Sequence, residues 1–229
     1  MSSTSIFVFI LGFLSQILFF ARTIVQWIQS EKAGKILSPV VFWQLSLLAS
    51  ILMILYGILR RDFAIILGQL ITFFIYVRNL QLQNSWTKIP FYFRVLVITM
   101  PFACLLWLIL SGNYSFNSIM QNENIPLWLF LFGILAQLIF TFRFVYQWLV
   151  SEKNKLSEFP LGFWYISLSG SLLIFTYGLF RTDPVLVLGH LGSMVMYLRN
   201  IMLHYTGKGL FDLLPFDLGV VSKRLSKKE

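Results

Sequence analysis

The sequence is poor in charged residues, and this shortage excludes an ordinary soluble domain. Only 12% of the 229 residues are charged, about half the share of a typical soluble protein, whereas 58% are hydrophobic. The mean hydropathy is +0.78. The single cysteine, Cys104, excludes an internal disulfide and is interpreted as a packing residue. The composition therefore indicates a protein whose surroundings are a lipid bilayer.

Residues for catalysis and for metal binding are also scarce. There are nine acidic residues and two histidines, and His190 and His204 have no metal-ligand partners at a useful spacing. No Gly-rich phosphate loop and no Ser–His–Asp set is found in the sequence. We therefore expect no catalytic residues, no metal and no cofactor, and a chain that is not itself an enzyme.

Long apolar runs predict an all-α membrane protein with seven transmembrane helices. The runs lie near residues 6–29, 39–60, 63–83, 91–111, 126–150, 160–181 and 184–204. They leave no room for a separate soluble catalytic domain. Because the number of spans is odd, the two termini are expected on opposite sides of the membrane.

The distribution of basic residues predicts the orientation. Arg60, Arg61 and Arg181 fall on the N-terminal side, whereas the other loop and tail cations, such as Lys32 and Lys153, fall on the C-terminal side. The positive-inside rule therefore predicts an outer N-terminus and a cytoplasmic C-terminus. Because the charge follows membrane sidedness, the net charge of +9 does not indicate nucleic-acid binding. The basic tail, residues 206–229, is expected to contact anionic lipid or only to aid solubility.

The sequence repeats itself with an offset of 121 residues, so that residues 12–82 match residues 133–203. The stretch RTIVQWIQSEK at 22–32 returns as RFVYQWLVSEK at 143–153. We expect two three-helix repeats, residues 1–85 and 123–205, joined by a linker helix within 86–122. The linker helix makes the two repeats run the same way, in a 3+1+3 arrangement with parallel repeats.

Four repeated arginines are expected in one layer near the cytoplasmic edge of the bilayer. Arg22 lies about 24 Å from the outer boundary at ~1.5 Å per residue, and Arg78 lies about as deep. Arg143 and Arg199 repeat these positions. Arginine in hydrocarbon is costly unless it faces a cavity, a partner or a headgroup, and its planar fork suits phosphate or carboxylate.

Two interpretations of this layer remain open: snorkelling to lipid phosphates, or convergence on an anionic substrate group. In the second, the headgroup-binding residues are Arg22, Gln26, Arg78, Asn79, Arg143, Gln147, Arg199 and Asn200, and the cavity-lining residues are Gln16, Gln137, Trp43, Trp164, Tyr76, Tyr197 and His190. Glu31 and Glu152 could instead pair with nearby lysines or with the arginines.

Small residues on shared helix faces predict close packing. Ser46 and Ser50 lie on one face of the second run, and Gly68 and Thr72 lie on one face of the third, with repeat partners that include Gly189. Small residues of this kind allow membrane helices to approach closely.

The repeated pattern R-x3-Q-W-x2-S-E-K, P-x2-F-W-x2-S, Y-G-x2-R-x-D and Y-x-R-N resembles the lipid-A-disaccharide synthase N-terminal domain family, as a stand-alone tandem copy. The family is similar to the superfamily of PQ-loop proteins, SWEET carriers, pyruvate carriers and the KDEL receptor. Gln26 and Gln147 fall at the position of the PQ glutamine, but Val25 and Tyr146 replace the proline. The resemblance implies a SWEET-like fold in a bacterial inner membrane, with a periplasmic N-terminus and a cytoplasmic C-terminus.

The resemblance implies a role in lipid A or lipid-linked sugar biosynthesis. The glycosyltransferase that gives the family its name is absent, so the chain is expected to bind or translocate an anionic glycolipid, either a lipid A precursor or a polyprenyl-phosphate sugar. The alternatives are a SWEET-like carrier of a small solute and a non-catalytic scaffold for a glycosyltransferase. The expected partners are membrane lipids, glycolipids and a glycosyltransferase, and a monomer is possible.

Overall fold

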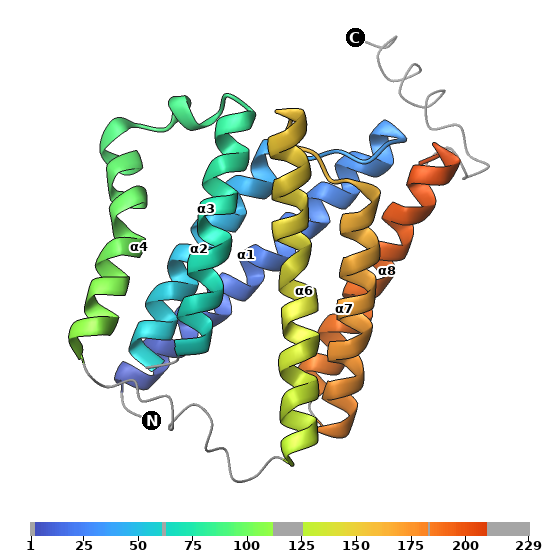
Figure 1. Ribbon diagram of the computed structural model, residues 1–229. Coiled ribbons are helices and arrows are strands. Elements are labelled where there is room, and N and C mark those ends of the chain that lie inside the picture. Colours follow the sequence, from blue (N-terminus) through green and yellow to red (C-terminus); the bar gives the residue numbers. More distant parts are fainter. Residues whose placement is uncertain (1–2, 61–62, 112–125, 183, 210–229) are drawn as a thin grey trace, which may run out of the picture.

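The computed structural model describes residues 3–60, 63–111, 126–182 and 184–209 (Figure 1). These residues form seven α-helices, one short 3-10 helix and no strand. The α-helices are α1 (Ser3–Ala33), α2 (Val40–Arg60), α3 (Phe63–Leu82), α4 (Phe91–Ser111), α6 (Leu127–Asn154), α7 (Leu161–Phe180) and α8 (Pro184–Thr206), and η1 is Trp86–Lys88. The prediction of an all-helical protein with seven helices is confirmed.

The helices form two groups of three, with α4 standing at one side (Figure 1). In the first group α2 packs between α1 and α3, and in the second α7 packs between α6 and α8. The groups meet where α3 contacts α6 and where α1 contacts α8. Repeat-equivalent helices run in the same direction, and α4 contacts α3 through Phe74 and Phe102, whose rings lie 6.1 Å apart.

Four of the described helices are long and apolar enough to span a bilayer: Ile10–Ala33, Val40–Leu59, Leu127–Asn154 and Leu161–Phe180. The other three, α3, α4 and α8, have 20, 21 and 23 residues, which are suitable lengths for a span. Many large apolar side chains are exposed on the outside of the bundle, among them Phe13, Leu138 and Leu188. Seven membrane spans therefore remain a prediction, and all seven helices are long enough for one.

The turns after α1 and α6 show why the two repeats fold alike. Gly34 and its repeat equivalent Lys155 both have left-handed backbone, with φ of 64° and 54°. Pro39 and Pro160 then immediately precede α2 and α7, where a missing N–H costs no helix hydrogen bond. The turn at Gly34 and the repeated proline thus set where the chain reverses.

Close packing is found at the predicted serines but not at the predicted glycines. Ser46, Ser50, Ser167 and Ser171 are fully buried, as expected for a packed face. At Gly68 and Gly189, however, an added Cβ would meet nothing within 4 Å, so the prediction is wrong for these glycines. A close approach to the backbone of a neighbouring helix instead occurs at Gly170, whose Cβ would lie 2.8 Å from Cα of Phe140 on α6.

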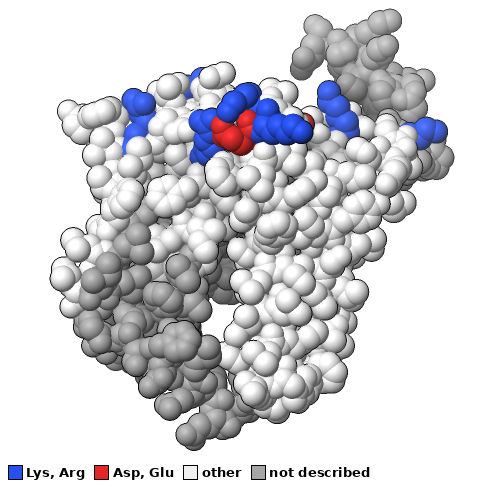
Figure 2. Space-filling view, viewed as in Figure 1, with Lys and Arg blue, Asp and Glu red and all other residues white. Residues whose placement is uncertain are grey.

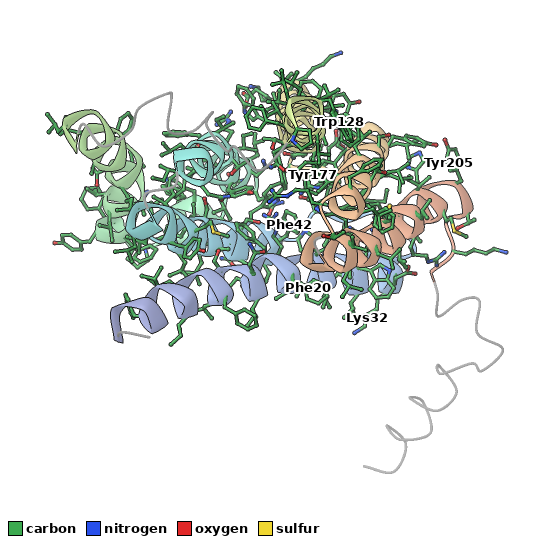
Figure 3. All side chains as sticks on the ribbon, turned by 90° about the horizontal axis from the view of Figure 1, so that it is seen from below. Phe20, Lys32, Phe42, Trp128, Tyr177 and Tyr205 are labelled. Carbon is green, nitrogen blue, oxygen red and sulfur yellow. The ribbon has the colours of Figure 1, made fainter. Side chains whose placement is uncertain are left out.

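An aromatic core joins the two groups of helices. Phe159, in the α6–α7 turn, stacks on Trp43 with ring centroids 5.3 Å apart and also contacts Trp164 at 5.5 Å. Phe42 contacts Phe159 at 5.0 Å and lies between the two groups when the bundle is viewed from below (Figure 3). This core supports the buried polar side chains that lie between the two groups of helices. The packing prediction for Cys104 and the prediction for tail residues 210–229 lie outside the described side chains.

Candidate functional site

The two repeats are joined by a pair of equivalent amide contacts. Gln147 on α6 donates from Nε2 to Oδ1 of Asn79 at 2.8 Å, and Asn79 donates back to Oε1 of Gln147 at 3.1 Å. Gln26 on α1 donates to Oδ1 of Asn200 on α8 at 3.0 Å. All four side chains are at most 1% exposed. Their amide groups therefore largely satisfy one another across the seam between repeats.

Two equivalent ion pairs flank these amides. Arg78 forms a bidentate contact with Glu152 through Nε and Nη2, at 2.6 and 2.8 Å, and Arg199 contacts Glu31 at the same two distances. Bidentate pairing of this kind uses the planar fork of the guanidinium fully. Of the pairings left open by the sequence, the one between arginine and the repeated glutamate is present in both repeats, and Glu152 also pairs with a lysine, Lys155. Figure 2 shows that the charged side chains on this face gather at one end of the bundle.

The repeated serine links the seam to the turn. Ser30 Oγ accepts hydrogen bonds from Nε2 of Gln26 and from the backbone N–H of Leu37, both at 2.9 Å. Ser151 accepts from Gln147 at 2.8 Å and from the N–H of Glu158 at 3.2 Å. The repeated Q-W-x2-S-E segment is thus explained by structure: its Gln and Glu join the repeats, and its Ser holds the following turn.

Arg22 and Arg143 lie outside this seam, one helical turn before the glutamines. They are 7% and 8% exposed. Arg22 donates from Nη1 to Ser46 at 2.7 Å and to the hydroxyl of Tyr76 at 3.2 Å, whereas Arg143 donates to the hydroxyl of Tyr197 at 3.0 Å. In both arginines the buried Nε–H has no hydrogen-bond partner. Each guanidinium therefore keeps donor capacity for a further group.

Aromatic rings surround the two guanidinium groups, and one ring is common to both. Both lie against the Phe144 ring, with Arg22 Cζ 5.2 Å and Arg143 Cζ 4.8 Å from its centroid. Arg143 also lies 3.4 Å from the Phe140 ring, and Arg22 lies 4.5 Å from Phe19. Ring faces stabilise a cation but carry no net charge. We call Arg22 and Arg143, with the rings around them, the arginine pair.

The charge of the arginine pair is not balanced by the described residues. The ion pairs of the described part of the chain join Arg78, Lys155 and Arg199 to Glu152 or Glu31, and none involves Arg22 or Arg143. Two buried like charges that contact the same ring repel each other and have lost their hydration. An anion between them would relieve both costs, so the arrangement is suited to binding phosphate or carboxylate.

The predicted cavity-lining residues divide into three groups. Tyr76 and Tyr197 bind the arginine pair, and Trp43 and Trp164 pack against these tyrosines at 6.1 Å. His190 lies on α8 beside Ser171, with Nδ1 2.9 Å from its hydroxyl. Gln16 and Gln137 are exposed, and Gln137 donates to Thr141 at 3.5 Å. The structure thus brings the tyrosines and tryptophans to the arginine pair but not the two glutamines.

Two features of the site were missed from the sequence. The first is a repeated phenylalanine three residues before each arginine, Phe19 and Phe140, which could have been read as an F-x2-R motif on one helix face. The second is Phe144, which has no aromatic counterpart in the first repeat. Within the described residues no group of three His, Cys, Asp or Glu side chains could hold a metal ion.

Comparison with known proteins places the chain in a family. The family described as Lipid A Biosynthesis N-terminal domain matches residues 11–81 and 132–202, which together make up more than half of the chain. Lipid-A-disaccharide synthase of Chlamydia pneumoniae is 32% identical over 204 residues, and that of Chlamydia caviae is 28% identical over 209 residues.

Each of these matches covers 85% of this chain but only 33% of the relative, so the chain spans about a third of their length. No solved structure matches the chain. The two matched segments coincide with the two groups of helices and contain both halves of the seam and of the arginine pair. The chain belongs to the Lipid A Biosynthesis N-terminal domain family and carries two copies of that domain in tandem.

Proposed function

We propose that this protein binds the anionic headgroup of a lipid-linked sugar, a lipid A precursor or a polyprenyl-phosphate sugar, between Arg22 and Arg143. The observation that carries the proposal is the arginine pair itself. Both guanidinium groups are buried, contact the same Phe144 ring, have an unpaired Nε–H and make no ion pair with a described carboxylate. A phosphate is a natural partner for guanidinium groups that no carboxylate neutralises.

The proposal assigns different roles to the four repeated arginines. Arg78 and Arg199 hold the repeats together through Glu152 and Glu31, and the Gln–Asn contacts support them. Arg22 and Arg143 bind the headgroup. Hydroxyl groups orient both guanidinium groups. Those of Ser46 and Tyr76 accept hydrogen bonds from Arg22, and that of Tyr197 accepts one from Arg143. The core rings then exclude water, which strengthens the electrostatic attraction to an anion.

The family supports a lipid ligand over a small soluble solute. The matched relatives are named lipid-A-disaccharide synthases, and the matched family is named for lipid A biosynthesis. We propose that the protein presents or translocates the bound glycolipid in a bacterial inner membrane, for a glycosyltransferase that acts on it.

Native mass spectrometry of the purified protein tests the proposal. A lipid A precursor, an undecaprenyl-phosphate sugar, a bulk phospholipid and a free sugar phosphate are offered in competition. We expect selective retention of one of the two glycolipids, and loss of that selectivity in the double variant Arg22→Gln/Arg143→Gln.

Arg181→Gln is the matched control, because Arg181 is an exposed arginine whose side chain, among the described residues, contacts Tyr177 of the preceding helix turn. It should keep the selectivity of the wild-type protein. Equal retention of all four compounds, or unchanged selectivity in the double variant, would refute headgroup binding by the arginine pair.

A further inference from the structure

A second feature of the molecule lies on the outside of the seam. A groove of about 670 Å³ runs between α3 and α6, a volume typical of small-molecule sites. Its walls are mainly apolar, with Ile71 and Phe74 from α3 and Val145 and Trp148 from α6, and the Arg78–Glu152 ion pair also lines it. The groove therefore has apolar walls and a charged group at the end where α6 finishes.

The two ion pairs of the seam differ in solvent exposure, and the more exposed pair is the one that lines the groove. In the Arg78–Glu152 pair the side chains are 36% and 31% exposed, whereas in the equivalent Arg199–Glu31 pair they are 10% and 4% exposed. Arg199 is additionally covered by the backbone carbonyl of Lys208, which it contacts at 3.1 Å. One ion pair is thus sealed, and the other is open to a ligand in the groove.

A further cation, Lys155, lies next to the charged end of the groove, where it contacts Glu152. Glu152 pairs with Lys155 as well as with Arg78, so two positive charges face one carboxylate. Lys155 has left-handed backbone at φ 54°, where the first repeat has Gly34. A side chain costs conformational energy at such a position, and strain of this kind is often kept for function. The second repeat therefore holds a lysine at the charged end of the groove despite that cost.

We propose that this groove holds one acyl chain of an anionic phospholipid, whose headgroup phosphate lies against Lys155 and Arg78. The apolar walls match the chain, and the net positive charge at the end matches the phosphate. The site is separate from the arginine pair and uses neither Arg22 nor Arg143, so it goes beyond the proposed function. It accounts for the open groove and for the lysine in place of glycine.

The acyl-chain part of the proposal is tested by photo-crosslinking in phosphatidylcholine nanodiscs that contain phosphatidylglycerol with a diazirine on its acyl chain. We expect labelled peptides from residues 71–81 and 145–152. Ile71→Trp fills the groove and should reduce this labelling severalfold. Leu191→Trp is the matched control, because Leu191 on α8 is 49% exposed, close to the 45% of Ile71, and does not line the groove.

Equal labelling of these peptides in both variants would overturn the acyl-chain site. Ile71→Phe, a smaller change at the same exposed position, serves if the tryptophan variant is not monodisperse, and it should give an intermediate loss. Uniform labelling of all lipid-facing helices in the wild-type protein would also contradict the proposal, because ordinary boundary lipid gives that pattern.

The headgroup part is tested with Lys155→Gly, which restores the residue of the first repeat and removes the backbone strain. This variant should fold at least as well as the wild-type protein. A second probe, phosphatidylcholine with the same diazirine acyl chain, has no net headgroup charge. We expect the preference of the variant for the phosphatidylglycerol probe over this one to fall severalfold, while labelling by the phosphatidylcholine probe is unchanged. An unchanged preference would overturn the role of Lys155. Because Arg22 and Arg143 are intact in every variant, these results do not depend on glycolipid binding at the arginine pair.

Discussion

At the scale of single residues, the arginines of the two repeats perform two different tasks. Arg78 and Arg199 are neutralised by bidentate contacts with glutamate, and they join the repeats. Arg22 and Arg143 are buried against phenylalanine and tyrosine rings, with hydroxyl groups as their hydrogen-bond partners. Hydroxyl groups do not balance charge, so the arginine pair is expected to destabilise the ligand-free protein and to be stabilised by an anion.

The variant Arg143→Gln should therefore be more stable than the wild-type protein in the absence of ligand. Removing one of two adjacent buried cations relieves their repulsion, and the glutamine keeps a hydrogen-bond donor for Tyr197. A gain of about 1 kcal/mol would raise the melting temperature by roughly 2–4 °C. Thermal unfolding in one detergent measures this, with Arg181→Gln as the control. A clear fall in melting temperature would show that the cation itself stabilises the fold.

The two ion pairs of the seam should respond unequally to the loss of their carboxylate. Glu31→Gln leaves the buried Arg199 without a counter-charge, and breaking a buried pair typically costs about 3–5 kcal/mol. Glu152→Gln should have a much smaller effect, because its pair is partly exposed. The double variant Glu31→Gln/Arg199→Gln should regain part of the loss. Unfolding measurements on the three variants compare these values, and equal losses from the two single variants would contradict the account.

The sequence could identify most of the polar residues that meet at the seam and at the arginine pair, but not how they divide between the two. The repeat identified Arg22, Gln26 and Glu31 with their equivalents, and all of them contact the seam or the arginine pair. Their partners could not be predicted, because Arg78 and Glu152 meet only when α3 and α6 pack together. The exposure of Gln16 and Gln137 was unpredictable for the same reason: depth along a helix follows from residue number, but the direction of a side chain depends on neighbouring helices.

At the scale of helices, the hydropathy of the sequence predicts where each helix lies, but it predicts the ends of the helices less accurately. The run at 91–111 coincides with α4, whereas the run at 126–150 is exceeded by α6, which continues to Asn154. The difference arises because the polar Ser-Glu-Lys segment remains helical beyond the apolar run. That extension matters for the site, because it carries Ser151 and Glu152 to the seam.

Packing between α6 and α7 should depend on Gly170. A Cβ at this position would lie 2.8 Å from Cα of Phe140, which is backbone and cannot turn aside. Gly170→Ala should therefore lower stability by about 1–3 kcal/mol, the usual cost of overpacking. Gly189→Ala is the control, since its Cβ would meet nothing within 4 Å. Melting temperatures of the two variants test this. An unchanged melting temperature in Gly170→Ala would mean that the two helices can move apart without a loss of stability.

At the scale of the whole molecule, two similar units are joined by contacts that are formed twice. Contacts between α3 and α6 and between α1 and α8 are equivalent, and each consists of one Gln–Asn contact and one Arg–Glu pair. The offset of 121 residues predicted this duplication. It could not predict the inequality of the two halves, in which a groove accompanies one ion pair and the other is covered.

The predicted orientation can be tested because Cys104 is the only cysteine in the chain. In a Cys104→Ser background, Lys153→Cys and Arg181→Cys place single thiols at exposed positions on opposite ends of the bundle. We expect a membrane-impermeant maleimide to label Arg181→Cys in intact cells and Lys153→Cys only after the cells are opened. The reverse labelling would invert the topology and place the arginine pair near the outer surface.

The most direct test of the central claim is the affinity of one lipid A precursor measured with and without its phosphate group. If the arginine pair binds the headgroup, the phosphorylated form should bind the wild-type protein at least about tenfold more tightly, which corresponds to ~1.4 kcal/mol. This ratio should fall to about one in Arg22→Gln/Arg143→Gln. A ratio near one in the wild-type protein, or an equal preference for phosphate in the double variant, would contradict the account.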